Sequence, residues 1–352
     1  MFRTKLIAFS RLMNIFYLLA AFTACGTVTL QNRSAAMPDW VRDPYRKFDR
    51  QANVAAVGTG SSANAAEKDA FGKLVAVFGQ SIQVDEKIST SYREALRSGA
   101  ASSWTENTAF DSMIAMSAGM DSLIGAEIGA AWDDGKINYY AAAVLNKVKA
   151  LQVYSNLVTA NKAMIFNLVN MPEAEKITFE GFARYQLAAS VADVTITYGN
   201  LLTHIGDPSY AQGLKKGDEY RLEAQNIAKS IPVGIKVTDD RAGKIQGAFA
   251  KALSDIGFRS GGNNPRYVLE ADISVFPVDF PNNPNKFARI ELNANLTDTS
   301  VKSVLLPFNY SAREGHPNIS EAENRAYNEA VRAINEGYKD LLLDYMSNLL
   351  PN

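Results

Sequence analysis

Hydrophobic and polar residues alternate in several segments of this chain, and each such segment predicts a β-strand with one buried face. Alternating runs at 124–132 and 137–145 flank Asp133-Asp134-Gly135-Lys136. This pattern predicts a hairpin, because Asp-Gly between two alternating runs is typical of a tight turn. The other predicted strands cover 53–60, 82–88, 232–237, 267–275, 288–296 and 304–310. Pro307 places the last of them at a sheet edge, because proline has no N–H to donate to a neighbouring strand.

Apolar residues spaced three and four apart predict helices between these strands. The predicted helices cover 64–78, 151–168, 177–205, 220–231, 245–256 and 320–348. Asn64 with Glu67, and Ser320 with Glu323, have the spacing of a capping box at a helix start. Asp239 or Asp240 is the expected cap of the helix at 245–256.

The order of these elements predicts an α+β fold. We expect two small modules, each an antiparallel sheet with helices in a β-α-β-β-β-α-like order, joined by a helical middle segment. Ala70-Phe71-Gly72-Lys73 and Ala248-Phe249-Ala250-Lys251 occupy similar places in the two modules, which leaves open whether they are repeats. The predicted organisation is 1–24 signal peptide, 25–36 tether, 37–150 first α+β domain, 151–230 helical segment and 231–352 second α+β domain.

The first 24 residues have the parts of a secretory signal, with Arg3, Lys5 and Arg11 before or at the start of an apolar run. Cys25 follows the small residues Thr23-Ala24 and is the one cysteine of the chain. This resembles the bacterial lipobox, although Phe22 stands where leucine is usual. We therefore predict a lipoprotein, cut before Cys25 and carrying diacylglyceryl and N-acyl lipid on it. A signal peptide cut nearby and an uncleaved anchor are the alternatives.

The residue after Cys25 is Gly26 rather than aspartate. By resemblance to the sorting rule of enteric bacteria, this favours the outer membrane, at its periplasmic face. We expect the lipid alone to attach the protein to the membrane, because no other apolar run is long enough to span a bilayer.

Composition narrows the function further. Hydrophobic residues make up 47% and charged residues 21% of the chain, as in ordinary folded proteins. The formal net charge is -1, and without the three basic leader residues it is -4, so nucleic acid is not an expected partner. A single cysteine rules out an internal disulfide and a cysteine-rich metal site.

Residues 37–150 resemble the Lpp-twenty family of bacterial outer-membrane lipoproteins. The resemblance is carried by Pro38-x-Trp40, Val57-Gly58-x-Gly60, the alanine-rich helix that follows, and Trp132-x-x-Gly135 with Tyr139-Tyr140-Ala141. Some members of that family belong to flagellar or surface assemblies. The resemblance implies a small α+β module in the cell envelope and implies no catalytic residue.

Few residues offer chemistry. Gly58-Thr59-Gly60-Ser61-Ser62-Ala63 fits a dinucleotide-binding glycine motif, but a tight strand-to-helix turn explains it better, because the strands around it predict an antiparallel sheet. His204 and His316 are far apart in sequence and belong to no metal or catalytic motif. Asp133-Asp134 and Asp239-Asp240 are expected to form a turn and a cap, and 281–285 an exposed loop.

We therefore predict no enzyme, no metal and no cofactor beyond the lipid at Cys25. The expected function is a binding or scaffolding role in an outer-membrane or surface assembly, such as a motility apparatus, with protein partners in the envelope. Whether the chain forms a homo-oligomer is left open. The alternatives are a periplasmic carrier of a lipid or apolar ligand and, last, an enzyme.

Overall fold

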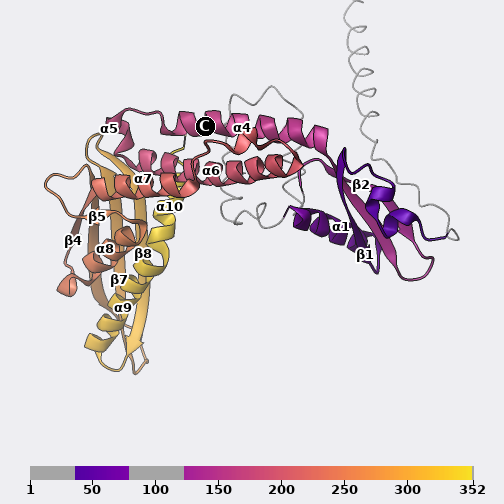
Figure 1. Cartoon of the computed structure of the whole chain (residues 1–352). Coiled ribbons are helices and arrows are strands. Elements are labelled where there is room, and N and C mark those ends of the chain that lie inside the picture. The colour runs from indigo at the N-terminus through magenta and orange to yellow at the C-terminus, as the bar shows by residue number, and fades with distance from the viewer. Residues whose placement is uncertain (1–35, 79–122, 351–352) are drawn as a thin grey trace, which may run out of the picture. The chain divides into compact units, whose positions relative to one another are not determined.

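The structure is a computed structural model that describes residues 36–78 and 123–350 (Figure 1). These residues form two compact units, which divide between Val153 and Tyr154. Each unit combines a sheet with helices, so the predicted α+β class is confirmed. Cys25 and the strand predicted at 82–88 lie outside the described residues.

The sheet of the first unit has three antiparallel strands in the order β1-β3-β2. They are β1 (Asn53–Gly60), β2 (Ala126–Asp133) and β3 (Tyr139–Asn146). The predicted hairpin between β2 and β3 is confirmed. Asp133 accepts a hydrogen bond from the Gly135 amide at 2.9 Å and Asp134 one from the Lys136 amide at 2.8 Å. Both aspartates therefore shape the turn, as predicted.

Helix α1 (Ala63–Val77) packs on this sheet through Ala66, Ala70 and Leu74, which are buried. The helix begins at Ser62, whose hydroxyl accepts from the Ala65 amide at 3.2 Å. The capping box predicted at Asn64 and Glu67 is wrong, because the chain enters the helix directly after β1. Two short 3-10 turns, η1 (Asp39–Val41) and η2 (Pro44–Arg46), precede β1 and bury Trp40.

Four helices make up the middle segment: α4 (Lys147–Val169), α5 (Glu173–Lys176), α6 (Phe179–Ile205) and α7 (Gly217–Ser230). The second unit takes in α4 from Tyr154 onward and the other three helices. Met171-Pro172 separates the first two. Thr178 caps α6 by accepting from the Gly181 amide at 3.0 Å, and Gly206 ends it with a left-handed φ of 115°. Buried aliphatic side chains join α4 to α6.

The sheet of the second unit has five strands in the order β5-β4-β6-β7-β8. They are β4 (Pro232–Thr238), β5 (Arg259–Ser260), β6 (Tyr267–Val278), β7 (Lys286–Asp298) and β8 (Ser303–His316). Strands β6, β7 and β8 are antiparallel, and β8 lies at the edge, as Pro307 predicts. Strand β4 pairs in parallel with β6, unlike the all-antiparallel sheet that we expected. The reason is the helix between them, since a helical crossover returns the chain in the same direction.

Helices cover one face of this sheet (Figure 1). They are α8 (Lys244–Ile256), α9 (Ile319–Ala333) and α10 (Lys339–Ser347), with the 3-10 turn η6 (Arg241–Gly243) before α8 and the π-helical turn η7 (Ile334–Tyr338) between α9 and α10. Phe249 is fully buried at their centre, with its ring 4.9 Å from that of Tyr338. This face therefore forms the main core.

Of the two helix caps predicted on this face, the one at α8 is confirmed and the one at α9 is wrong. Asp240 accepts from the amides of Ile245 and Gln246 at 3.1 and 2.9 Å, so its role at the start of α8 is confirmed. The box predicted at Ser320 is wrong by two residues, because Asn318 is the cap of α9 and accepts from the Ser320 amide at 2.9 Å.

Candidate functional site

The five-stranded sheet exposes the side chains of its second face. Along β6, Leu269, Ala271 and Ile273 are buried while Glu270 and Asp272 are exposed, and β7 follows the same alternation. We define the open face by the residues that register places on this side: Lys236, Glu270, Asp272, Ser274, Phe276, Arg289, Glu291, Asn293, Asn295, Asn309, Ser311 and Arg313. All are exposed except Glu291, which is partly buried.

The middle of the open face carries asparagine and serine side chains beside two carboxylates. Asn293 on β7 lies between Asp272 on β6 and Asn309 on β8. In the next row, Ser311 lies opposite Glu291. Amide side chains both donate and accept hydrogen bonds, so this surface can pair with the polar groups of another chain.

Two arginines form the next row. Arg289 on β7 is directly opposite Arg313 on β8. Neither side chain takes part in an ion pair of 4.0 Å or less within residues 36–78 and 123–350. Like charges that face each other across a strand pair destabilise a sheet. By contrast, Lys236 lies 3.1 Å from Glu270 further along the open face.

Phenylalanine side chains surround the two arginines. Phe276 lies opposite Arg289 on β6, and the ring centroids of Phe280 and Phe287 are 4.8 Å apart. The Arg313 guanidinium lies 4.5 Å from the Phe280 ring centroid. Phe276 and Phe280 each remain 38% exposed. We call Phe276, Phe280, Phe287, Arg289 and Arg313 the arginine–phenylalanine end.

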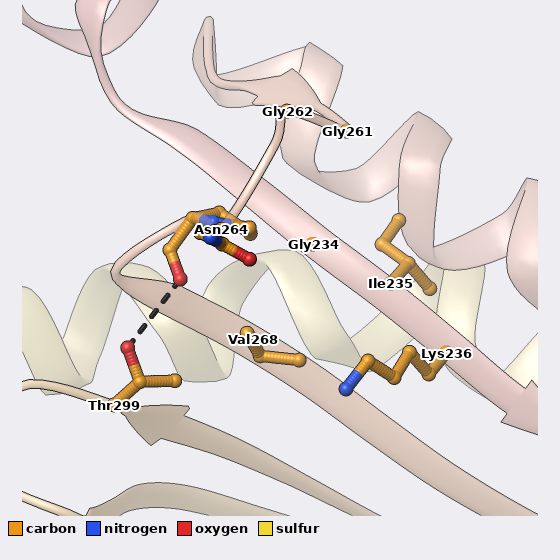
Figure 2. A pocket seen from close by; sticks show the side chains of 9 residues that line it. Gly234, Ile235, Lys236, Gly261, Gly262, Asn264, Val268 and Thr299 are labelled. Carbon is orange, nitrogen blue, oxygen red and sulfur yellow. Dashed lines mark hydrogen bonds between the residues drawn. The ribbon is translucent and has the colours of Figure 1, made fainter.

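A shallow groove of about 570 Å³ lies near the opposite end of the sheet (Figure 2). Gly234, Lys236 and Val268 contribute from β4 and β6, while a glycine-rich loop and Thr299 close the sides. Gly234 leaves room for the Pro265 ring, because a Cβ on Gly234 would lie 2.8 Å from Pro265 Cγ. The Thr299 hydroxyl donates to the Pro265 carbonyl at 3.4 Å. Figure 2 marks a hydrogen bond at Thr299 with a dashed line. Among the described residues that line the groove, Lys236 is the one with a titratable side chain, so these residues offer no acid–base pair.

The glycine motif at 58–63 has a packing role. A Cβ on Gly58 would lie 2.0 Å from the Ala70 backbone nitrogen, and one on Gly60 would lie 2.6 Å from Ala66 N. Helix α1 therefore rests directly on β1, and β1 pairs antiparallel with β3. A dinucleotide motif needs a parallel βαβ unit, so the geometry favours the turn.

The two histidines considered in the sequence analysis lie on different elements of the second unit. His204 lies exposed at the end of α6, with Nδ1 2.9 Å from the Asn200 carbonyl. His316 ends β8, and its Nδ1 accepts from the Asn318 amide at 3.1 Å. No group of three metal-ligating side chains occurs in the described part of the chain. The described helices also include none that is long and apolar enough to cross a membrane.

Two buried polar clusters serve the fold. Tyr327 donates to Asp240 and accepts from the Arg241 amide at 2.8 Å, which holds the chain before α8. Burial and the Asp240 carboxylate raise the pKa of Tyr327. Burial opposes ionisation of Asp298, yet hydrogen bonds from Arg266 and Ser300 together lower its pKa. These side chains are tied to neighbouring loops, so neither cluster has the arrangement of a nucleophile and base.

Sequence reasoning recognised the alternating strands but missed the arginine–phenylalanine end. Arg289 and Arg313 are 24 positions apart, and the register that brings them together is set by the bulge between Leu296 and Thr297. The exposed loop at 281–285 was predicted. Phe280, immediately before this loop, was the residue from which the arginine–phenylalanine end could have been suspected.

Comparisons with known proteins give no family. No family model matches the chain, and no curated protein matches it, so membership of the Lpp-twenty family stays a prediction. The secreted protein HP1454 from Helicobacter pylori is similar with a TM-score of 0.41 and 15% identity, over 82% of this chain and 100% of that one. A minor lipoprotein from Acinetobacter baumannii has a TM-score of 0.25 and 13% identity, over 34% and 96%. Lipoprotein GNA1162 from Neisseria meningitidis has a TM-score of 0.20 and 13% identity, over 28% and 98%. Likeness this low assigns neither a family nor a function.

Proposed function

We propose that this protein is a lipid-anchored protein of the bacterial cell envelope that binds another protein through the open face of its second sheet. The anchor is the lipid on Cys25, at the outer membrane. The role is binding or scaffolding rather than catalysis, in an outer-membrane or surface assembly of the kind to which some Lpp-twenty proteins belong.

One observation carries the binding role: a five-stranded sheet buried on one face and exposed on the other. At one end it has two exposed phenylalanines and two arginines that form no ion pair within the described residues. A solvent-facing sheet needs only polar residues on its outer side. Two exposed phenylalanines and two facing arginines go beyond that requirement. Aromatic residues and arginine are enriched in protein interfaces, which supports a contact surface here.

The described cavities give less support to a carrier of apolar ligands. The groove beside Gly234 is open and lined partly by backbone and by Lys236. A second one, of about 350 Å³, is lined by side chains of α4, α6 and α7 and includes Lys162 and Lys215. Carrier sites are usually enclosed and predominantly apolar.

Photocrosslinking in intact envelopes tests the binding role. A benzophenone amino acid replaces Asn309 on the open face or, as the matched control, Gln225 on the exposed side of α7. The proposal predicts a discrete crosslinked species from position 309 and much less from position 225. Equal yields from the two positions would mean that the open face is not the contact surface.

The anchor has its own test. Palmitate labelling is expected for the wild-type chain and absent for Cys25→Ser, with the label recovered in the membrane fraction. Label of equal strength on both chains would remove the anchor from the proposal.

A further inference from the structure

The arginine–phenylalanine end has a chemistry that the fold does not use. Arg289 and Arg313 face each other across β7 and β8, and neither is paired with a carboxylate in the described residues. Every other row of the open face avoids such a contact: Lys236 pairs with Glu270, and Asp272 faces Asn293. A local rule broken at one place, with no carboxylate partner among the described residues, points to a function.

The two guanidinium groups suit one anionic group. Side chains directly opposite each other on antiparallel strands lie close enough to bind one ligand together. Arginine binds carboxylate through two parallel hydrogen bonds, and a second arginine doubles the available donors. A bound carboxylate would also relieve the repulsion between the two cations.

The phenylalanines indicate which chemical group lies next to the carboxylate in the ligand. Phe276 lies beside Arg289, and Phe280 lies under the Arg313 guanidinium at 4.5 Å from its ring centroid. Stacking on an aromatic ring holds a guanidinium in place and leaves its donors free. Gly315 makes room for the Phe287 ring, because a Cβ there would lie 2.6 Å from it. The two rings at 38% exposure therefore offer apolar contact next to the charge.

We infer that the arginine–phenylalanine end binds an acidic segment of a partner protein, in which a carboxylate side chain stands next to an aromatic or aliphatic one. This inference rests on the proposed function and names the partner's chemistry. The asparagines and serines that continue from the arginines suit a peptide backbone, whereas a lipid surface would not use them. Asp279, beside Phe280, and Glu291 also disfavour an anionic membrane at this end.

A random copolymer of glutamate and tyrosine is the probe, with the full chain lacking its leader as the protein. Binding is measured by fluorescence anisotropy. The double variant Arg289→Gln/Arg313→Gln is expected to bind about tenfold more weakly, the loss expected for charge-assisted hydrogen bonds. The matched control Arg259→Gln/Lys302→Gln removes two exposed positive charges from the same unit and is expected to stay within about twofold of wild type. Phe280→Ala is expected to weaken binding of this copolymer more than binding of polyglutamate, which has no aromatic side chain.

Three results would overturn the inference: no binding by the wild-type chain, equal loss in the two double variants, or tighter binding to phosphatidylglycerol vesicles than to the copolymer. The last result would assign this end to a membrane. Crosslinking from position 309 in the Arg289→Gln/Arg313→Gln background separates the two proposals. If the crosslink is unchanged there, the acidic partner is wrong and the open face stands. If the crosslink is absent in wild type as well, the proposed function itself fails.

Discussion

Replacing Gly58 by alanine tests whether the glycine motif is a packing device. The added Cβ would meet three backbone atoms of α1: Ala70 N at 2.0 Å, Ala66 O at 2.3 Å and Ala70 Cα at 2.6 Å. Ordinary van der Waals contact begins at 3.4 Å. Backbone atoms cannot rotate away, so the helix itself has to move off the strand by roughly 1 Å or more.

The cost follows from what that movement exposes. Ala66, Ala70 and Leu74 are at most 1% exposed in the contact between α1 and the sheet. Overpacking a core usually costs about 1–3 kcal/mol, and a clash with backbone lies at the upper end of that range. We therefore expect Gly58→Ala to lower the free energy of unfolding of the first unit by about 3 kcal/mol.

Gly72 lies in the same helix and provides a control, because its replacement by alanine should change the unfolding free energy in the opposite direction. It is exposed, and a Cβ there meets nothing within 4 Å. Gly72→Ala should therefore stabilise the unit by about 0.5–1 kcal/mol through helix propensity. Urea unfolding followed by tryptophan fluorescence measures both, because Trp40 and Trp132 are buried in the core of this unit. An unchanged midpoint for Gly58→Ala, or a lower one for Gly72→Ala, would refute the close-packing account.

Three further predictions concern the second unit and the anchor. Phe249→Ala should cost about 3–5 kcal/mol of unfolding free energy, while Val304→Ala on the exposed edge strand should stay within about 0.5 kcal/mol, and circular dichroism in urea checks both. Asp298 has a lowered pKa in the folded state, so its ion pair stabilises the fold above its ordinary pKa of 3.8, and this stabilisation is lost as the pH falls toward the folded value. Asp298→Asn should therefore destabilise the protein at pH 7 and flatten the plot of unfolding free energy against pH below pH 5. A plot parallel to that of wild type would contradict this. Cys25→Ser should move the protein from the membrane to the soluble fraction after cell lysis, and an unchanged distribution would exclude the lipid as the anchor.

The sequence predicted the elements well because strand alternation and helix spacing are local. The hairpin at 133–136 and the proline at the edge of β8 both follow from residues within one turn or strand. Two predicted caps were wrong because several polar residues near a helix start compete for the same amides. Ser62 and Asn318 were the nearer residues to the preceding strands.

The parallel pairing of β4 and the meeting of Arg289 with Arg313 needed the structure. Both depend on which strands become neighbours and in what register, and a single sequence encodes that only through the assembled core. The two modules also differ here, because β1 pairs antiparallel with its neighbour while β4 pairs in parallel. The matched phenylalanines of the two modules differ in burial: Phe249 is fully buried, whereas Phe71 is only partly buried.

The most direct test of the account is to block the open face without touching its arginines. Asn293→Arg/Asn309→Arg places bulk and charge in the middle of the face, and Gln225→Arg/Lys229→Glu alters the exposed side of α7 as the control. Each full-length variant is crosslinked in intact envelopes and purified, and the proteins that are attached to it are compared with those attached to wild type. If this sheet face is the binding surface, the open-face variant loses the partner recovered with wild type, while the α7 variant retains it. Retention of that partner by the open-face variant would contradict the central claim that this sheet face is the binding surface.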